Sequence, residues 1–357
     1  MNRDPILFRV DATPASGFDR YTRCMTYAAA LQRRRRPTFF LSQLEPRSMG
    51  MTIKRAGSDW LDADAPAGSP EDLAETIQEV RRLKPAAVIL DAPGITEQYV
   101  QELMATGVCV VSMDHQANIN LPSQLIINPL LAPGKEAYGH GLRSQLLLGS
   151  RYTLVRSEIR RVRPGRSQEP PTPFSALLPI GDDDQDLKVI ELAKLLTSVP
   201  KLERVDIIVR PEHPQLERLQ ALAEASNDRI KLAQEPAEVT ARIARCHFAI
   251  THGNGFSLEL ACVGVPQLLV VQNEGYWPTA QRLEEEGAAT CLGWHESVTP
   301  TTIRQAVQNL LGDPFERQAM ARCGRQLIDA RGPDRLVTAL EVMLHPSRQL
   351  RHLAAAA

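Results

Sequence analysis

Short apolar runs alternate with helical segments along most of this chain, and this alternation limits the possible folds more than any other feature. In the first third, apolar runs predict strands at residues 6–10, 38–41, 86–90, 108–112 and 125–127. Helical patterns separate them at about 20–36, 70–84 and 96–106, and residues 45–60 form a connecting helix or loop. Strands that alternate with helices form parallel sheets with right-handed crossovers. We therefore expect an α/β domain here.

The same alternation restarts after a basic, proline-rich stretch at residues 160–173, which is typical of a linker. Further strands are predicted at 174–178, 204–209, 229–232, 248–250 and 267–271, with helices between and after them. A length of 357 residues suits two domains. We expect an N-terminal Rossmann-like domain at 1–160, a linker at 161–173, a C-terminal Rossmann-like nucleotide-binding domain at 174–345 and a frayed tail at 346–357, with an interdomain cleft.

Composition argues against several classes of function. A net charge of −1 gives no reason to expect a nucleic-acid partner, and the basic run Arg33–Arg36 suits the end of a helix. The six cysteines are far apart and form no C-x-x-C pair, so we expect no metal site, no disulfide framework and no cofactor. No apolar run is long enough to span a membrane, and the start lacks an apolar signal core. We expect a cytoplasmic protein, and leave its oligomeric state open.

Polar residues follow four predicted strands of the N-terminal domain. They are Asp11, Asp91, Asp114 and Asn128. Parallel sheets bind ligands beyond the carboxyl ends of their strands, so we expect these residues to meet at a ligand-binding edge. His115 follows Asp114 and is a candidate for proton transfer, because histidine titrates in the useful range.

A strand, a glycine turn and a helix follow one another at Ile250–Pro266, and this order suits phosphate binding. Backbone N–H groups and the helix dipole would hold the phosphate, and Glu259 would accept hydrogen bonds from ribose hydroxyls. The alternative is an ordinary turn in which glycine only allows tight geometry. His252 is a second candidate for proton transfer. The predicted nucleotide-binding residues are His252, Gly253, Asn254, Gly255, Phe256 and Glu259.

Four segments in order carry a family resemblance. Residues 8–24 are similar to a Phe-Arg-x-Asp start followed by Gly-x-Gly-His-x-x-Arg-Cys, and residues 146–156 to Leu-Leu-Gly-x-x-Tyr-x-x-Leu-Arg. Residues 250–266 are similar to Ile-Ser-x-Gly-Gly-Ser-Thr-x-x-Glu with a Leu-Gly-Val-Pro end, and residues 329–335 to Asp-Gly-x-Gly-x-x-Arg. Together they resemble the UDP-2,4-diacetamido-2,4,6-trideoxy-β-L-altropyranose hydrolases of pseudaminic acid biosynthesis. The resemblance implies a GT-B architecture, a UDP-sugar in the interdomain cleft and no metal.

The chain departs from this family where the chemistry is concentrated. Arg20 stands at the position of the family's catalytic histidine, and arginine stays protonated, so it cannot take a proton from water. Asp19 replaces a glycine and is an alternative carboxylate base. Arg20 and Arg23 would instead neutralise a phosphate or a sugar carboxylate. The acids Asp182–Asp184 align with a glycine turn of the family, where they would repel a diphosphate.

Three functions remain open from the sequence. The first is a sugar-nucleotide-binding protein related to the UDP-sugar hydrolases, which releases UDP and free sugar if it is active. The second is an inactive relative that acts as a binding or regulatory module, and the third is a GT-B glycosyltransferase that uses an acceptor hydroxyl in place of water. Tyr276 and Trp277 either stack on a sugar or pack against helices. The predicted catalytic residues are Asp19, Arg20 and His115, and the predicted sugar-binding residues are Asp11, Gly17, Arg23, Asp91, Asp114, Glu274 and Tyr276.

Overall fold

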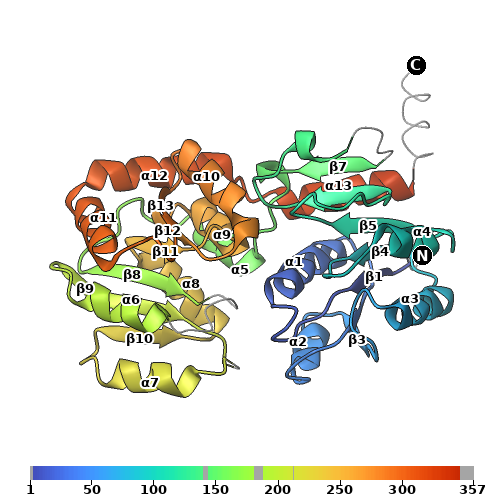
Figure 1. Ribbon diagram of the computed structural model, residues 1–357, viewed down its shortest axis with the longest axis horizontal. Helices are drawn as coiled ribbons and strands as arrows, with labels where there is room; N and C mark the ends of the chain where they lie inside the picture. Colours follow the sequence, from blue (N-terminus) through green and yellow to red (C-terminus); the bar gives the residue numbers. More distant parts are fainter. Residues whose placement is uncertain (1–2, 140–143, 181–187, 212, 346–357) are drawn as a thin grey trace. The chain divides into compact units, whose positions relative to one another are not determined.

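A computed structural model describes residues 3–139, 144–180, 188–211 and 213–345. The chain divides into two compact units, one made of Met1–Leu154 with Arg331–Ala357 and the other of Val155–Ala330. Each unit is built on one parallel sheet, as the alternation of strands and helices predicted (Figure 1). The expected turn at Asp182–Asp184 and the expected tail at 346–357 lie outside the described residues.

Unit 1 contains a seven-stranded parallel sheet. The strands lie in the order β3-β2-β1-β4-β5-β6-β7, so the strand order reverses between β1 and β4. Their bounds are β1 (Ile6–Arg9), β2 (Thr38–Ser42), β3 (Asp59–Asp62), β4 (Ala87–Leu90), β5 (Cys109–Met113), β6 (Leu125–Asn128) and β7 (Gln145–Leu148). A reversal of this kind opens a crevice at the carboxyl ends of the strands.

Helices cover both faces of this sheet and bury its central strands. They are α1 (Asp19–Arg33), α2 (Met49–Arg55), α3 (Pro70–Leu83), α4 (Glu97–Met104) and α13 (Gly332–Leu344), with short 3₁₀ turns at Lys135–Ala137 and Ser150–Tyr152. Successive residues of a strand point to opposite faces. Accordingly, Ile6 and Phe8 of β1 pack on one side of the sheet and Leu7 on the other. Phe8 also stacks on Phe40 of β2, with ring centroids 4.8 Å apart.

Unit 2 repeats the architecture with six parallel strands in the order β10-β9-β8-β11-β12-β13. The strands are β8 (Phe174–Pro179), β9 (Leu202–Ile208), β10 (Ile230–Ala233), β11 (Phe248–Thr251), β12 (Gln267–Val271) and β13 (Thr290–Trp294). The helices are α5 (Ser157–Val162), α6 (Lys188–Thr197), α7 (Leu216–Glu224), α8 (Pro236–Arg245), α9 (Gly255–Val263), α10 (Trp277–Glu285), α11 (Pro300–Gly312) and α12 (Pro314–Leu327), with a 3₁₀ turn at Glu274–Tyr276.

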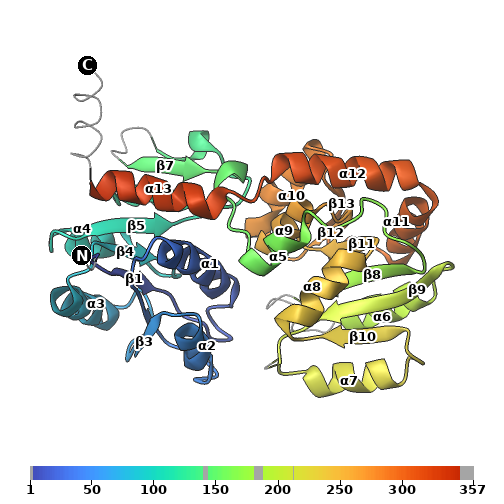
Figure 2. The same ribbon diagram turned by 180° about the vertical axis from the view of Figure 1, so that it is seen from behind.

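The last helix lies in a different unit from the one that the sequence predicted. We expected residues 174–345 to form the C-terminal domain, but α13 packs on unit 1 (Figure 2). Leu336 and Leu340 complete the core beneath α1, and the Tyr27 hydroxyl donates a hydrogen bond to the carbonyl of Leu336 at 3.2 Å. Gly332 lets the start of α13 approach the backbone of Thr153 closely, because an added Cβ would lie 2.0 Å from the Thr153 carbonyl oxygen.

The predicted linker at 161–173 is also part of a folded unit. Arg163 donates to the carbonyls of Cys262 at 2.8 Å and Arg325 at 2.7 Å, and the buried Arg166 donates to the carbonyl of Cys246 at 2.7 Å. These carbonyls lie at the carboxyl ends of α9, α12 and α8, where helices leave acceptors unpaired and favour positive charge. The basic run that suggested a linker therefore caps three helices of unit 2.

No helix in the described part of the chain is both long enough and apolar enough to cross a membrane.

Candidate functional site

Four predicted ligand residues lie at the carboxyl edge of the unit 1 sheet. Asp11, Asp91, Asp114 and Asn128 follow or end β1, β4, β5 and β6, which are consecutive neighbours in the sheet. Asn128 is fully buried, and its side chain bonds to the backbone of Leu130 and Pro133 at 3.0 and 3.2 Å. Its amide therefore shapes the loop after β6.

Asp11 is held by protein groups on both oxygens. It forms an ion pair with the fully buried guanidinium of Arg9, which also pairs with Asp72. Its two oxygens accept hydrogen bonds from the backbone N–H groups of Gln43 at 2.8 Å and Ala67 at 3.0 Å. Asp11 thus fixes the two loops that follow β2 and β3, and its sugar-binding role stays a prediction.

Asp91 is shared by two arginines of α1. Arg23 binds it with two N–H groups, and the contact from Nε to Oδ2 measures 2.5 Å. Arg20 lies farther away, with Nε at 3.7 Å from Oδ1, and donates from Nη1 to the carbonyl of Ser16 at 3.0 Å. Since one buried carboxylate faces two guanidinium groups, this group of three residues carries one net positive charge.

A cavity of about 220 Å³ lies beside these arginines, entirely within unit 1. Its polar lining includes Arg20, Arg23, Asp114 and His115, and we call it the arginine pocket. Asp114 Oδ1 accepts hydrogen bonds from two backbone N–H groups at 2.9 and 3.1 Å. Asp114 Oδ2 is buried and has no hydrogen-bond partner among the described residues. The pocket thus contains one carboxylate oxygen that can accept a hydrogen bond.

His115 stands in this pocket as a neutral imidazole. Burial lowers its pKa, the charges of Arg23 and Arg20 lower it further, and the pKa falls to about 3. A neutral imidazole has a ring nitrogen that can accept a proton, but a pKa of about 3 makes it a weak base near neutral pH. The predicted role of His115 in proton transfer is therefore chemically available in this pocket, although it stays a prediction.

Gly17 and Asp19 lie at the start of α1. Gly17 has a φ of +74°, which suits glycine, and its N–H closes a turn on the Thr13 carbonyl at 2.9 Å. Asp19 is the exposed first residue of α1 and is not among the residues that line the arginine pocket. An acid at this position stabilises the helix dipole, and its role as a base stays a prediction.

In unit 2, the structure shows the predicted strand, turn and helix at Ile250–Pro266. β11 ends at Thr251, Gly253 turns the chain with a φ of +83°, and Asn254 caps α9 by accepting from the Ser257 N–H at 3.3 Å. The amides of Gly255 and Phe256 begin the helix, where no intrahelical acceptor exists. Both residues are partly exposed. This turn can therefore present two N–H groups to an anion.

His252 lies next to this turn and is anchored through one ring nitrogen. Its Nδ1 lies 2.9 Å from the Val270 carbonyl oxygen of β12. A contact with a carbonyl requires Nδ1 to carry the proton, which leaves Nε2 as the acceptor in the neutral ring. The role of His252 in proton transfer stays a prediction.

Glu259 is nearly fully engaged by Arg156. Its carboxylate is buried and accepts from the Arg156 backbone N–H at 2.7 Å, from Nε at 3.0 Å and from Nη2 at 2.7 Å. The same guanidinium lies over the ring of Phe256, 5.4 Å from its centroid. A carboxylate has about four acceptor positions. A ribose hydroxyl would therefore have to displace Arg156, and the ribose-binding role of Glu259 stays a prediction.

Two tryptophans line a hollow of about 390 Å³ in unit 2. Glu274, Trp277, Pro278 and Trp294 form its walls, whereas Tyr276 is not among them. The hollow includes residues that follow β12 and end β13, so it lies at the carboxyl edge of the sheet. Sugar-binding roles for Glu274 and Tyr276 stay predictions.

Several residues close to the predicted site residues of unit 2 escaped the sequence reasoning. Besides Arg156 and Trp294, they include Lys188, whose Nζ lies 2.7 Å from Nδ1 of His295. Lys188 begins α6 after β8, and His295 follows β13, so the contact joins elements from strands that are not neighbours. A prediction of the strand at Thr290–Trp294 would have placed Trp294 and His295 at the binding edge.

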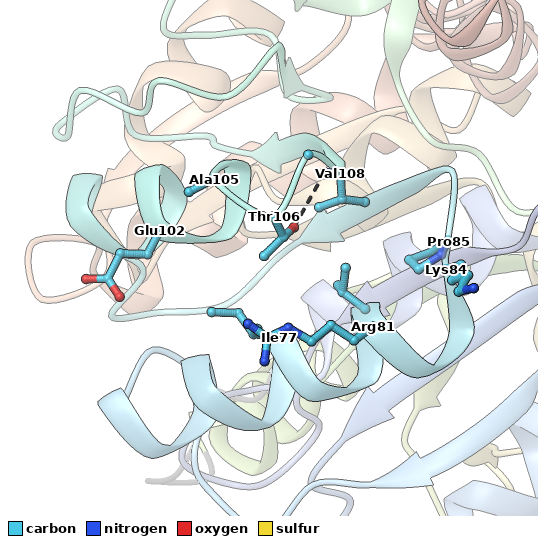
Figure 3. Close-up of a pocket in the computed structure, with 10 residues that line it drawn as sticks. Ile77, Arg81, Lys84, Pro85, Glu102, Ala105, Thr106 and Val108 are labelled. Atoms are coloured by element: carbon cyan, nitrogen blue, oxygen red, sulfur yellow. Dashed lines mark hydrogen bonds between the residues drawn. The ribbon is translucent and has the colours of Figure 1, made fainter.

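A larger hollow of about 780 Å³ lies at the opposite edge of the unit 1 sheet (Figure 3). Ile77 and Arg81 come from α3, and Ala105, Thr106 and Val108 from the turn between α4 and β5. No predicted site residue lines it. Arg81 stands in the last turn of α3, where a cation is favoured by the helix dipole. Among all the residues that the structure describes, no group of three or more His, Cys, Asp or Glu side chains is placed to hold a metal ion.

Two curated proteins share partial sequence similarity with this chain. The spore coat polysaccharide biosynthesis protein SpsG of Bacillus subtilis (strain 168) is 23% identical over 167 residues, which cover 46% of this chain and 49% of that protein. The UDP-N-acetylglucosamine–N-acetylmuramyl-(pentapeptide) pyrophosphoryl-undecaprenol N-acetylglucosamine transferase of Rhodopseudomonas palustris (strain BisB18) is 33% identical over 114 residues, which cover 29% and 30%. The matches thus span about half or less of these relatives. No protein-family model matches the sequence.

Solved structures resemble the chain over nearly its whole length. The spinosyn rhamnosyltransferase SpnG in complex with thymidine diphosphate aligns with a TM-score of 0.67 and 16% identity, covering 94% of this chain and 100% of that one. MurG of Acinetobacter baumannii aligns with a TM-score of 0.63 and 14% identity, covering 94% and 99%. At this identity the likeness establishes the fold. The chain therefore has the two-domain fold of the GT-B glycosyltransferases, as expected from the sequence.

Proposed function

We propose that this protein binds a nucleoside diphosphate sugar, with UDP as the expected nucleotide, and transfers the sugar to an acceptor hydroxyl. The observation that carries the proposal is the glycine turn of unit 2, where the partly exposed residues Gly255 and Phe256 begin α9 with N–H groups that have no intrahelical acceptor. A diphosphate is the anion that such a turn favours in α/β nucleotide sites.

The relatives support the same class of ligand. The Rhodopseudomonas relative is a transferase named for a UDP-sugar donor, and SpsG is named for polysaccharide biosynthesis. Among the structures with the same fold, SpnG holds thymidine diphosphate and an MnaA of S. aureus holds UDP.

The reaction needs few groups from the protein. The acceptor oxygen attacks the anomeric carbon, the bond from that carbon to the diphosphate oxygen breaks, and its electron pair leaves with the diphosphate. The acceptor proton passes to a base, for which the neutral imidazole of His115 is the best candidate in unit 1. The helix N-terminus at Gly255 offsets the charge that develops on the leaving group.

Hydrolysis of a UDP-sugar is the second candidate, and the resemblance of residues 8–24 and 250–266 favours it. Water would then replace the acceptor hydroxyl. Arg20 cannot serve as its base, because a guanidinium stays protonated and this one already donates to the Ser16 carbonyl. His115 or Asp19 would have to take the proton instead.

A pair of variants at Gly255 tests binding at the glycine turn. An added Cβ there would meet no atom within 4 Å, so Gly255→Ala and Gly255→Asp should both fold. The aspartate suits the helix dipole but repels a diphosphate. We expect calorimetry to show that Gly255→Asp weakens UDP binding at least about tenfold, whereas Gly255→Ala binds like the wild type.

The function itself is tested on the wild-type chain with uridine, thymidine, guanosine and cytidine diphosphates and the matching sugar nucleotides. Release of UDP that requires an acceptor supports the transferase, and release in water alone supports the hydrolase. Binding without either reaction would indicate a non-catalytic module. Failure to bind any nucleoside diphosphate at millimolar concentration would refute the proposal.

A further inference from the structure

We propose that the arginine pocket of unit 1 binds an acidic sugar, with the anionic group at Arg20 and a sugar hydroxyl donating to Asp114 Oδ2. The inference rests on the proposed function in one respect: the proposed function makes this sugar the acceptor or the donor of the glycosyl unit. Binding in the pocket can be measured separately.

The arginine side of the pocket favours an anion, while Asp114 carries a negative charge on the other side. Arg23 is bound on two atoms by Asp91, whereas Arg20 approaches the same carboxylate only to 3.7 Å. Arg20 is also 26% exposed on its side chain, and it lines the pocket. Its guanidinium is therefore placed to meet a carboxylate or a phosphate, which arginine can bind with two parallel hydrogen bonds.

The free acceptor in the pocket favours a hydroxyl. Asp114 Oδ1 is satisfied by the backbone N–H groups of Gln116 and Ala117, but the buried Oδ2 is not satisfied within the described residues. A buried acceptor without a donor destabilises the folded state. A ligand hydroxyl at Oδ2 would remove this penalty, whereas a simple inorganic anion would be repelled by the carboxylate.

The size of the pocket agrees with a single sugar unit. Its volume of about 220 Å³ lies below the roughly 300–1,000 Å³ of sites that hold drug-sized ligands. Gln116 and Asn118 also line the cavity, and their side-chain amides bond to each other, with Asn118 Nδ2 donating to Gln116 Oε1 at 3.1 Å. The amide hydrogens of Gln116 are not used in this bond and can donate to further hydroxyls. A pocket with a cation, a free carboxylate oxygen and amides differs from a phosphate site, which needs donors alone.

The test compares ligands that share a ring but differ in charge. The full chain is titrated at constant ionic strength with glucuronate, glucose 1-phosphate, glucose and inorganic phosphate, and binding is followed by ligand-observed NMR. We expect the two acidic sugars to bind at least about tenfold more tightly than glucose, and inorganic phosphate more weakly than glucose 1-phosphate. Preference between glucuronate and glucose 1-phosphate identifies the anionic group.

Three variants locate the site. Arg20→Gln should abolish the preference for acidic sugars, and Asp114→Asn should weaken binding of every sugar but leave that preference. Arg47→Gln removes an arginine that is 74% exposed and does not line the pocket, and it should change nothing. Circular dichroism and a thermal melt confirm that each variant is folded.

Two results would overturn the inference. One is equal binding of glucose and glucuronate, and the other is a charge preference that survives Arg20→Gln. If inorganic phosphate binds as tightly as glucose 1-phosphate, the pocket is a simple anion site and the proposal of a sugar ligand is wrong. We expect Gly255→Asp to weaken UDP binding in unit 2 and to leave unit 1 unchanged, so acidic-sugar binding that persists in this variant separates this inference from the proposed function.

Discussion

Gly253 should be far less replaceable than Gly255, although both belong to the same turn. Gly253 has a φ of +83°, and an alanine Cβ there would lie 2.8 Å from the Cβ of Ala280 in α10. At Gly255 an added Cβ meets nothing within 4 Å, and the backbone is that of a helix. The two positions therefore form a matched pair for one substitution, Gly→Ala.

The expected magnitudes differ in size and in sign. A left-handed backbone costs an L-residue roughly 1–2 kcal/mol, and overpacking against Ala280 adds roughly 1–3 kcal/mol. We expect Gly253→Ala to lower the free energy of unfolding by roughly 2–5 kcal/mol in total. Gly255→Ala should change it by less than about 0.5 kcal/mol or raise it slightly, since alanine is the better helix residue.

Thermal and urea denaturation of both variants measure the difference. Each kcal/mol shifts the midpoint by roughly 2–4 °C for a domain of about 150–250 residues, so Gly253→Ala should melt at least about 4 °C below the wild type. Hydrogen exchange should show the loss in α9 and α10. If Gly253→Ala were as stable as Gly255→Ala, the turn geometry from which phosphate binding is argued would be refuted.

Three further predictions concern Arg9, His115 and Glu259. Arg9→Met should destabilise unit 1 by roughly 3–5 kcal/mol in urea unfolding, because Asp11 and Asp72 would lose a buried partner, whereas Arg47→Met should not. His115 should stay neutral from pH 7 to 5 by NMR, and Arg20→Gln should raise its pKa. The pKa of His115 is lower in the folded state, so its contribution to stability is full above about pH 6.5 and declines as pH falls toward 3. Glu259→Gln should loosen the segment at Arg156, seen as faster amide exchange of α5.

The central strands were predictable from the sequence, and three edge strands were not. Strands such as β4 are buried on both faces and read as continuous apolar runs. In contrast, β3, β7 and β13 each lie at an edge and contain exposed or half-buried residues, so their apolar pattern is broken. The sequence also could not assign α13, because the partners of its apolar face lie some 300 residues earlier in the chain.

The position of the acidic residues at one sheet edge was predictable from the sequence, but their hydrogen-bond partners were not. Strand exits located Asp11, Asp91 and Asp114 correctly at one edge of the sheet, because position follows from local order. Whether an acid keeps an unpaired oxygen depends on partners that are distant in the sequence. Ala67 is 56 residues from Asp11, and Arg23 is 68 residues from Asp91. Local spacing contains no information about such contacts.

The arginine at position 20 has two consequences that act together. It removes a base at the place where the hydrolases have a histidine, yet its charge helps to lower the pKa of His115 in the same pocket. Arg20, which we propose binds the anionic group of a sugar, therefore also helps to keep His115 unprotonated. When the anion arrives, it offsets this charge, and the pKa of His115 should rise toward the range in which a general base works best. We therefore expect an acidic ligand to raise the pKa of His115 more than a neutral sugar does, while burial, the largest cause of the low pKa, continues to hold it below its usual value.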